Sequence, residues 1–180
     1  MWPLGHAAVA YLVYSLVTRM RGNRPPKRVP VIILLVASQF PDLVDKPLAW
    51  YVGALPTGRT LAHSLLVLVP LTLGVYLLAR RYDRVEYAIA FGIGVLSHAL
   101  LDALPALWGG TDPGFLLWPL VSVETYADGP PTVMGLLMAS LRDPYFHLEF
   151  VTAGLAILAW RADGYPGLAQ GSRNEGIPAD

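Results

Sequence analysis

Five long apolar segments limit what this chain can fold into. They cover residues 3–17, 30–41, 60–79, 85–108 and 146–160, and the short stretches between them hold most of the charged residues. The second segment is shorter than the roughly 20 residues that a membrane-spanning helix needs, whereas the third and fourth are long enough. The pattern predicts an all-α fold, a multi-pass transmembrane helical bundle with one or two partial or interfacial helices.

The composition indicates a membrane protein that works without thiol chemistry. Of the 180 residues, 54% are hydrophobic and 14% are charged, against about 25% charged residues in a typical soluble domain. The net charge is zero and there is no basic arm, so the lipid bilayer is the expected partner and nucleic acid is not. Cysteine is absent, and any metal site must therefore use His, Asp and Glu. We expect a membrane-embedded domain over residues 1–161 and a disordered polar tail over 162–180.

Basic residues mark one side of the predicted bundle. They cluster over residues 19–28 and 80–84 and recur at Arg161, and the positive-inside rule places such loops in the cytoplasm. Counting about 1.5 Å per residue from those ends puts the ionisable residues of five segments at one level. We therefore expect a multi-pass cell-membrane protein with a site toward the extracytoplasmic side. The candidate residues are His6, Asp42, Asp45, His63, His98, Asp102 and Glu149.

The stretch GVLSHALLDAL carries the sharpest local signal. His98 and Asp102 are spaced i,i+4 in an apolar run, which puts both side chains on one face of a helix. Burying an imidazole and a carboxylate costs free energy unless each has a partner. With His63 they could form the three-ligand set of a catalytic zinc site, which keeps a position open for water. Iron or manganese suits the same ligands, and His6 could complete a second site through a bridging carboxylate.

Polar residues before the third segment suit the remaining roles. Asp42 or Asp45 could orient or deprotonate a metal-activated water. Lys46 and Arg59 lie beside the proposed site and could hold an anionic substrate group such as phosphate. Thr60 follows the turn signal PTGR and is the expected N-cap of the third helix.

Five motifs in order resemble the membrane-bound metal-dependent hydrolases, also called the LexA-binding inner-membrane-associated hydrolases. The matching pieces cover most of residues 1–160 and are PLGHAAVA, FPDLVDKP, GRTLAHSLL, GVLSHALLDAL and FLLWPL. The order of ligands in that family is in turn similar to the zinc-dependent phospholipases C and single-strand nucleases. Many relatives have two acids one residue apart after the proline, whereas here two residues separate Asp42 from Asp45.

The resemblance implies a divalent metal cofactor, zinc in the first instance, as one or two ions. It assigns one ion to His63, His98 and Asp102, a neighbouring ion to His6, and a later acidic ligand to Glu149. Either acid of the FPDLVDKP motif qualifies as the catalytic base. Further histidine ligands of the phospholipase group are missing, so a three-ion site is not expected.

We therefore expect a membrane-bound metal-dependent hydrolase, in which metal-activated water attacks a phosphoester or related ester. The depth of the site suggests a lipid headgroup as substrate. Two other classes stay open. A transporter would place ionisable residues near the midplane with access from both sides, but the inner halves of these segments are nearly free of charge. A non-catalytic, metal-stabilised membrane protein would use the same residues around a closed metal site.

Overall fold

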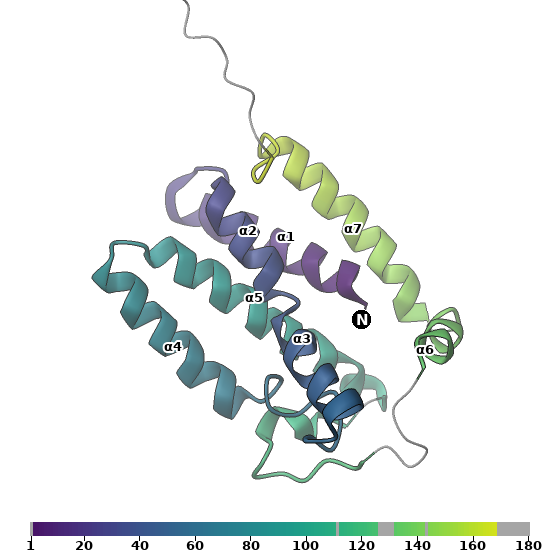
Figure 1. The fold of residues 1–180 in the computed structure, drawn as a ribbon. Coiled ribbons are helices and arrows are strands. Elements are labelled where there is room, and N and C mark those ends of the chain that lie inside the picture. Colours follow the sequence, from purple (N-terminus) through teal and green to yellow (C-terminus); the bar gives the residue numbers. More distant parts are fainter. Residues whose placement is uncertain (1, 111, 126–131, 143, 169–180) are drawn as a thin grey trace, which may run out of the picture.

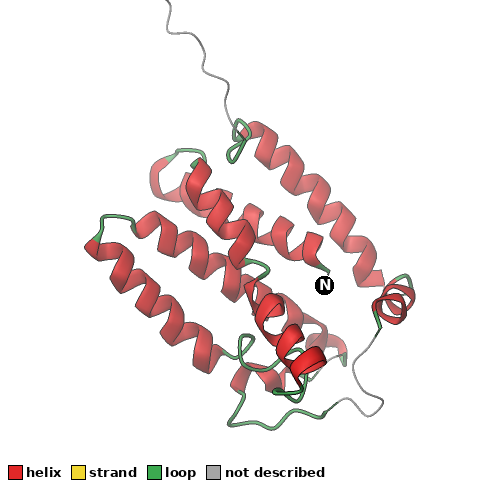
Figure 2. Ribbon diagram, in the orientation of Figure 1, coloured by secondary structure: helices red, strands yellow, loops and turns green. Residues whose placement is uncertain are grey.

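The described part of the chain is helical. The structure, a computed structural model, describes residues 2–110, 112–125, 132–142 and 144–168, and its regular elements there are all helices (Figure 2). In chain order they are α1 (Pro3–Gly22), α2 (Arg28–Ala37), α3 (Phe40–Pro47), the π-helix η1 (Leu48–Val52), α4 (Leu65–Arg81), α5 (Val85–Ala103), the 3-10 helices η2 (Leu104–Trp108) and η3 (Pro113–Leu117), α6 (Val133–Ser140) and α7 (Pro144–Ala162). The all-α prediction is confirmed for these residues.

Helix α5 lies at the centre of the bundle. It packs against α1, α2 and α4, and α1 packs in turn against α7, so the long helices run side by side (Figure 1). Small side chains such as Ala90, which is fully buried, let the neighbouring helices come close. At Gly94 a Cβ would lie 2.7 Å from Ala37 Cβ and 2.9 Å from backbone atoms of Leu34 and Ser38. This contact fixes α2 against α5, and so positions the residues that follow each helix.

Basic residues lie at one end of the bundle. Arg19, near the end of α1, pairs with Asp163, which follows α7. Lys27, before α2, pairs with Glu86 at the start of α5, with Nζ and Oε2 2.7 Å apart. These contacts tie the basic loops to one end, as the course of the helices in Figure 1 shows. The opposite end holds the start of α1, the whole of α3 and the end of α5, which carry most of the predicted site residues, and the loop before α4 adds Arg59 and His63.

One helical stretch of the described residues, Val85–Trp108, is long and apolar enough to cross a membrane. It comprises α5 and η2. The multi-pass arrangement stays a prediction beyond this one stretch. Other long helices also present apolar side chains outward, since Leu16, Leu73 and Leu158 are each more than half exposed. Exposed apolar surface of this extent marks contact with a protein or a membrane.

The third apolar segment starts its helix later than predicted. Helix α4 begins at Leu65, and its N-cap is Ser64, whose hydroxyl accepts from the N–H of Leu66 at 3.2 Å. The expected cap, Thr60, instead donates its backbone N–H to the carboxylate of Asp45 at 2.8 Å. The prediction of Thr60 as the cap is therefore wrong, because a tertiary contact holds residues 60–62 out of the helix.

The folded chain extends past residue 161. Helix α7 ends at Ala162, and Asp163 is buried and accepts hydrogen bonds from the hydroxyls of Tyr11 and Ser15, each at 2.7 Å. Residues 162–168 therefore belong to the folded chain, although the sequence placed them in a polar tail. The rest of that predicted tail, residues 169–180, lies outside the described residues.

We predict that Gly94→Ala destabilises the protein. Exchanging glycine for alanine in a helix normally stabilises it by up to about 1 kcal/mol. At Gly94 the new methyl group would meet Ala37 and backbone atoms closer than 3 Å, so α2 and α5 must move apart, at a cost of about 1–3 kcal/mol. The midpoint of thermal unfolding in detergent, followed by circular dichroism, should fall.

The matched control is Gly92→Ala, two residues earlier on α5. A Cβ there would meet nothing closer than 3.8 Å, so this variant should be at least as stable as the natural chain. Equal unfolding midpoints for the two variants would contradict the close contact between α2 and α5.

Candidate metal centre

His98 lies on α5 and presents one ring nitrogen to the site. The side chain is fully buried, and Nδ1 lies 2.6 Å from the carbonyl oxygen of Ser38. Helix α2 ends at Ala37, and the last carbonyls of a helix lack helical partners, so this oxygen can serve His98. A carbonyl only accepts, so Nδ1 carries the proton and Nε2 presents a lone pair.

The two acids of α3 contact opposite nitrogens of His63. Asp42 and Asp45 are three residues apart and share one side of the helix. Asp45 Oδ2 lies 2.8 Å from His63 Nδ1, and Asp42 Oδ1 lies 3.6 Å from Nε2. Asp45 also accepts hydrogen bonds from the backbone N–H groups of Thr60 and Ala62, at 2.8 and 2.9 Å. It therefore fixes the ring and its Nδ1 proton, and leaves Nε2 of His63 facing the site.

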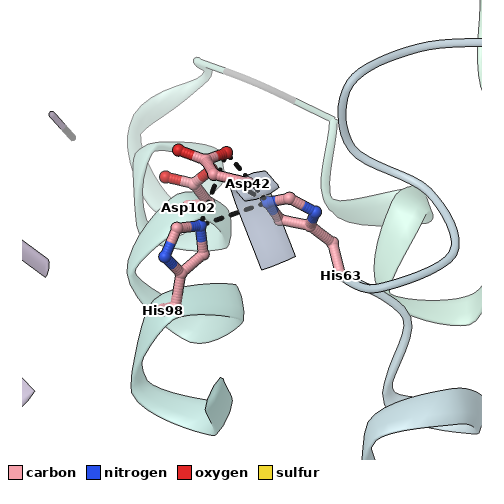
Figure 3. Close-up of side chains that lie close together, drawn as sticks. All are labelled: Asp42, His63, His98 and Asp102. Carbon is pink, nitrogen blue, oxygen red and sulfur yellow. Dashed lines mark hydrogen bonds and ion pairs between the residues drawn. The ribbon is translucent and has the colours of Figure 1, made fainter. Parts of the chain in front are cut away.

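The two Nε2 atoms face each other across 3.2 Å, and two carboxylates approach them (Figure 3). Asp102 Oδ2 is 3.6 Å from His63 Nε2, and Asp42 Oδ1 is 3.7 Å from His98 Nε2. One ligand atom from each of these four residues lies within 4.8 Å of every other. The spacing suits zinc, because bonds of about 2.0–2.1 Å in a tetrahedral site put ligand atoms roughly 3.3 Å apart.

This cluster of four needs a positive charge at its centre. With both Nδ1 atoms protonated, two lone pairs face each other and repel unless a cation lies between them. Asp42 Oδ1 is buried and, within the described residues, has no hydrogen-bond partner. Burial lowers the pKa of His63, but the carboxylates around the ring, Asp102 first, outweigh it and raise that pKa to about 10. A proton can supply the charge when metal is absent, and a divalent ion would displace that proton.

The cluster reaches the surface along one edge, where two cationic side chains lie. Lys46 forms an ion pair with Asp42, and Arg59 Nε donates to Asp102 Oδ2 at 2.7 Å. The side chains of Lys46 and Arg59 are 33% and 36% exposed and that of Asp42 is 11% exposed, whereas both histidines are fully buried. An anion that arrives at this edge would therefore meet an ammonium and a guanidinium group.

Two further predicted ligands lie beside the cluster. His6 stacks on His98 with ring centroids 3.7 Å apart, and its Nε2 lies 3.3 Å from Asp102 Oδ1. Glu149, on α7, is buried and accepts a hydrogen bond from the backbone N–H of Trp2, where a negative charge suits the N-terminus of α1. The structure thus brings His6 into contact with the cluster and places Glu149 at the start of α1.

Two residues that shape the site carry no chemical signal in the sequence. Ser38 acts through its backbone carbonyl, and the available signal is Pro41, because a helix usually ends before a proline. Phe115, on η3, packs edge-on against His63 with ring centroids 6.0 Å apart and is buried. Its motif, FLLWPL, is one of the five that resemble the hydrolase family. The motif does not indicate that the Phe115 ring packs against His63.

One family profile matches the chain. It is described as YdjM inner membrane protein and aligns with residues 1–165, which include every residue of the cluster. No curated protein matches the chain, and no solved structure does. The family description gives a location in the inner membrane and names no reaction.

We predict that Asp45→Asn weakens metal binding. The Asp45 carboxylate now accepts from three N–H donors, two in the backbone and one on His63. The NH₂ group of an asparagine would face one of these donors and could not accept from it. His63 would then no longer be held in one tautomer. Loss of such a supporting carboxylate typically lowers metal affinity about 10–100-fold. Zinc affinity is measured by competition with a chromophoric chelator in detergent, with circular dichroism to check the fold. Asp83→Asn, an exposed acid in the α4–α5 turn, is the control, and equal affinities for both variants would exclude a positioning role for Asp45.

Proposed function

We propose that this chain, which belongs to the YdjM inner membrane protein family, is a membrane-bound metal-dependent hydrolase. One divalent ion, zinc in the first instance, is held by His63, His98 and Asp102. When bound, such an ion lowers the pKa of a water molecule and so supplies a nucleophile near neutral pH. The substrate is a phosphoester or related ester.

The facing imidazoles carry this proposal. Their Nε2 atoms lie 3.2 Å apart, and each Nδ1 is already committed, to the Ser38 carbonyl in one ring and to the Asp45 carboxylate in the other. Metal-binding histidines characteristically donate their second ring N–H to a carbonyl or a carboxylate in this way. Any buried N–H needs an acceptor, so the distinguishing feature is that the two remaining Nε2 atoms face each other.

Asp42 is better placed than Asp45 to handle the proton. The oxygens of Asp45 accept from two backbone N–H groups and from His63, whereas Asp42 Oδ1 lacks a hydrogen-bond partner within the described residues. In the reaction, the water oxygen bonds to phosphorus and the P–O bond to the alcohol breaks. Asp42 accepts a proton from the water and returns it to the departing alkoxide. Lys46 and Arg59 hold the phosphate oxygens.

The arrangement in the membrane favours a lipid headgroup as the substrate. The cluster and the basic loops lie at opposite ends of the bundle, so basic loops in the cytoplasm would put the cluster toward the extracytoplasmic side. We propose a multi-pass topology, because the long helices that surround α5 carry exposed apolar side chains. In that setting, the edge with Lys46 and Arg59 lies near the phosphates of the outer leaflet.

A second function, a metal-stabilised membrane protein without catalysis, is favoured by one observation. Together with the three ligands named above, Asp42 offers a fourth ligand atom within 4.8 Å of the others. Four protein ligands fill a tetrahedral zinc shell, which is the mark of a structural site. The ion would then join α3, α5 and the loop before α4.

We predict that Asp42→Asn strongly lowers the rate of hydrolysis while zinc stays bound. Zinc-loaded protein in detergent is assayed with bis(p-nitrophenyl) phosphate and with phospholipid in mixed micelles, and metal content is measured on the same samples. Loss of a positioned base should lower kcat about 10²–10⁴-fold. Asp112→Asn, an exposed acid before η3, should keep full activity.

The two functions give opposite results in this experiment. Loss of zinc from Asp42→Asn, together with no hydrolysis by the natural chain, would overturn the hydrolase and establish the closed structural site. Retained zinc with lost activity would establish Asp42 as the group that handles the proton.

A further inference from the structure

An apolar groove lies at the basic end of the bundle, far from the metal cluster. It encloses about 390 Å³ between α2, α4 and α5. Its walls are apolar side chains of these three helices, including Ile33, Val75 and Phe91, and Arg84 before α5 and Tyr87 in the first turn of α5 also line it. A groove with this lining can take a hydrocarbon chain, and the charged residues beside it determine which polar group can be bound there.

Positively charged residues gather where the groove meets the α4–α5 turn. Arg84 lines the groove itself, with its guanidinium 5.7 Å from the ring centroid of Tyr87, and Arg80 and Arg81 lie one turn before it at the end of α4. Across the described ranges, none of these three arginines pairs with a carboxylate. Of the nearby acids, Glu86 is already paired with Lys27 at 2.7 Å, and the exposed Asp83 offsets one of the three positive charges.

The start of α5 offers a second kind of anion contact. Arg84 is the N-cap residue of α5, and no side chain caps the helix there. The first N–H groups of a helix lack helical partners and attract anions. The N–H of Tyr87 already donates to the Arg84 carbonyl oxygen at 2.9 Å, so a phosphate at this point would meet the guanidinium group of Arg84 and the N–H groups of Val85 and Glu86.

We infer that this groove binds an anionic phospholipid from the leaflet at the basic end of the bundle. An acyl chain lies along Ile33, Val75 and Phe91, and the phosphate lies at Arg84 and the start of α5. Membership of an inner membrane protein family places the protein at a bilayer, and basic pockets between helices on the cytoplasmic side of membrane proteins bind anionic headgroups. The site is independent of the proposed hydrolase, because it shares no residue with the metal cluster.

Native mass spectrometry on detergent-purified protein tests this site. The protein is titrated with phosphatidylglycerol, with phosphatidylcholine of the same acyl chains, and with inorganic phosphate. We expect phosphatidylglycerol to bind more tightly than phosphatidylcholine, and inorganic phosphate not to displace it. Arg84→Gln should weaken phosphatidylglycerol binding about five-fold, and Ala79→Phe, which fills the groove wall while keeping every arginine, should weaken both lipids.

The control is Arg24→Gln, an exposed arginine in the loop between α1 and α2, which should bind lipid as the natural chain does. Equal losses in Arg24→Gln and Arg84→Gln would show non-specific attraction and overturn the site. Unchanged binding in Ala79→Phe, or displacement of the lipid by inorganic phosphate, would also overturn it, since either result means a free anion site without a chain in the groove. Unfolding midpoints are compared first, and if one groove variant fails to fold the other decides.

Discussion

The contact between His63 and His98 is the constraint on which the rest of the site depends. Two imidazoles that expose lone pairs to each other at 3.2 Å need a proton or a metal ion between them. The surroundings enforce this contact, because Asp45 fixes one ring and the Ser38 carbonyl fixes the other. Gly94 contributes at a distance, since its lack of a side chain brings the end of α2 close enough to α5 for that carbonyl to reach His98.

The ionisable residues lie mainly at the two ends of the bundle, with an apolar region between them, as expected for a membrane protein. The metal cluster with its buried histidines lies at one end, where Lys46 and Arg59 cover its edge, and the unpaired arginines and the apolar groove lie at the other. The helical region between them is apolar, and α5 passes through it as the one described stretch that meets the length and composition of a membrane span. In the topology that we propose, the two ends meet different leaflets, and the proposed hydrolase site and the proposed lipid site lie far apart.

The sequence predicts which residue types form the cluster better than it predicts how their side chains contact one another. The i,i+4 spacing of His98 and Asp102 and the common level of His63 follow from helix periodicity and from counting along the segments, and the structure places all three in one cluster. Counting residues along a helix gives depth in the bundle but not which neighbouring helix a side chain faces. Glu149 was therefore predicted as a ligand, whereas its side chain, on α7, contacts the start of α1. The different contacts of Asp42 and Asp45 depend on which face of α3 meets which nitrogen of His63, and a sequence without an alignment does not reveal that packing. The late start of α4 has the same cause, because Asp45 holds the backbone of residues 60–62.

Metal content tests the central claim most directly. The natural chain, the double variant His63→Ala/His98→Ala and the control His147→Ala are purified in detergent, incubated with zinc, dialysed and analysed by inductively coupled plasma mass spectrometry. His147 is the one exposed histidine of the four in the chain, so its removal controls for surface binding. We predict about one equivalent of zinc in the natural chain and in His147→Ala, and none in the double variant. Equal zinc in all three proteins, or none in the folded natural chain, would contradict a metal between His63 and His98.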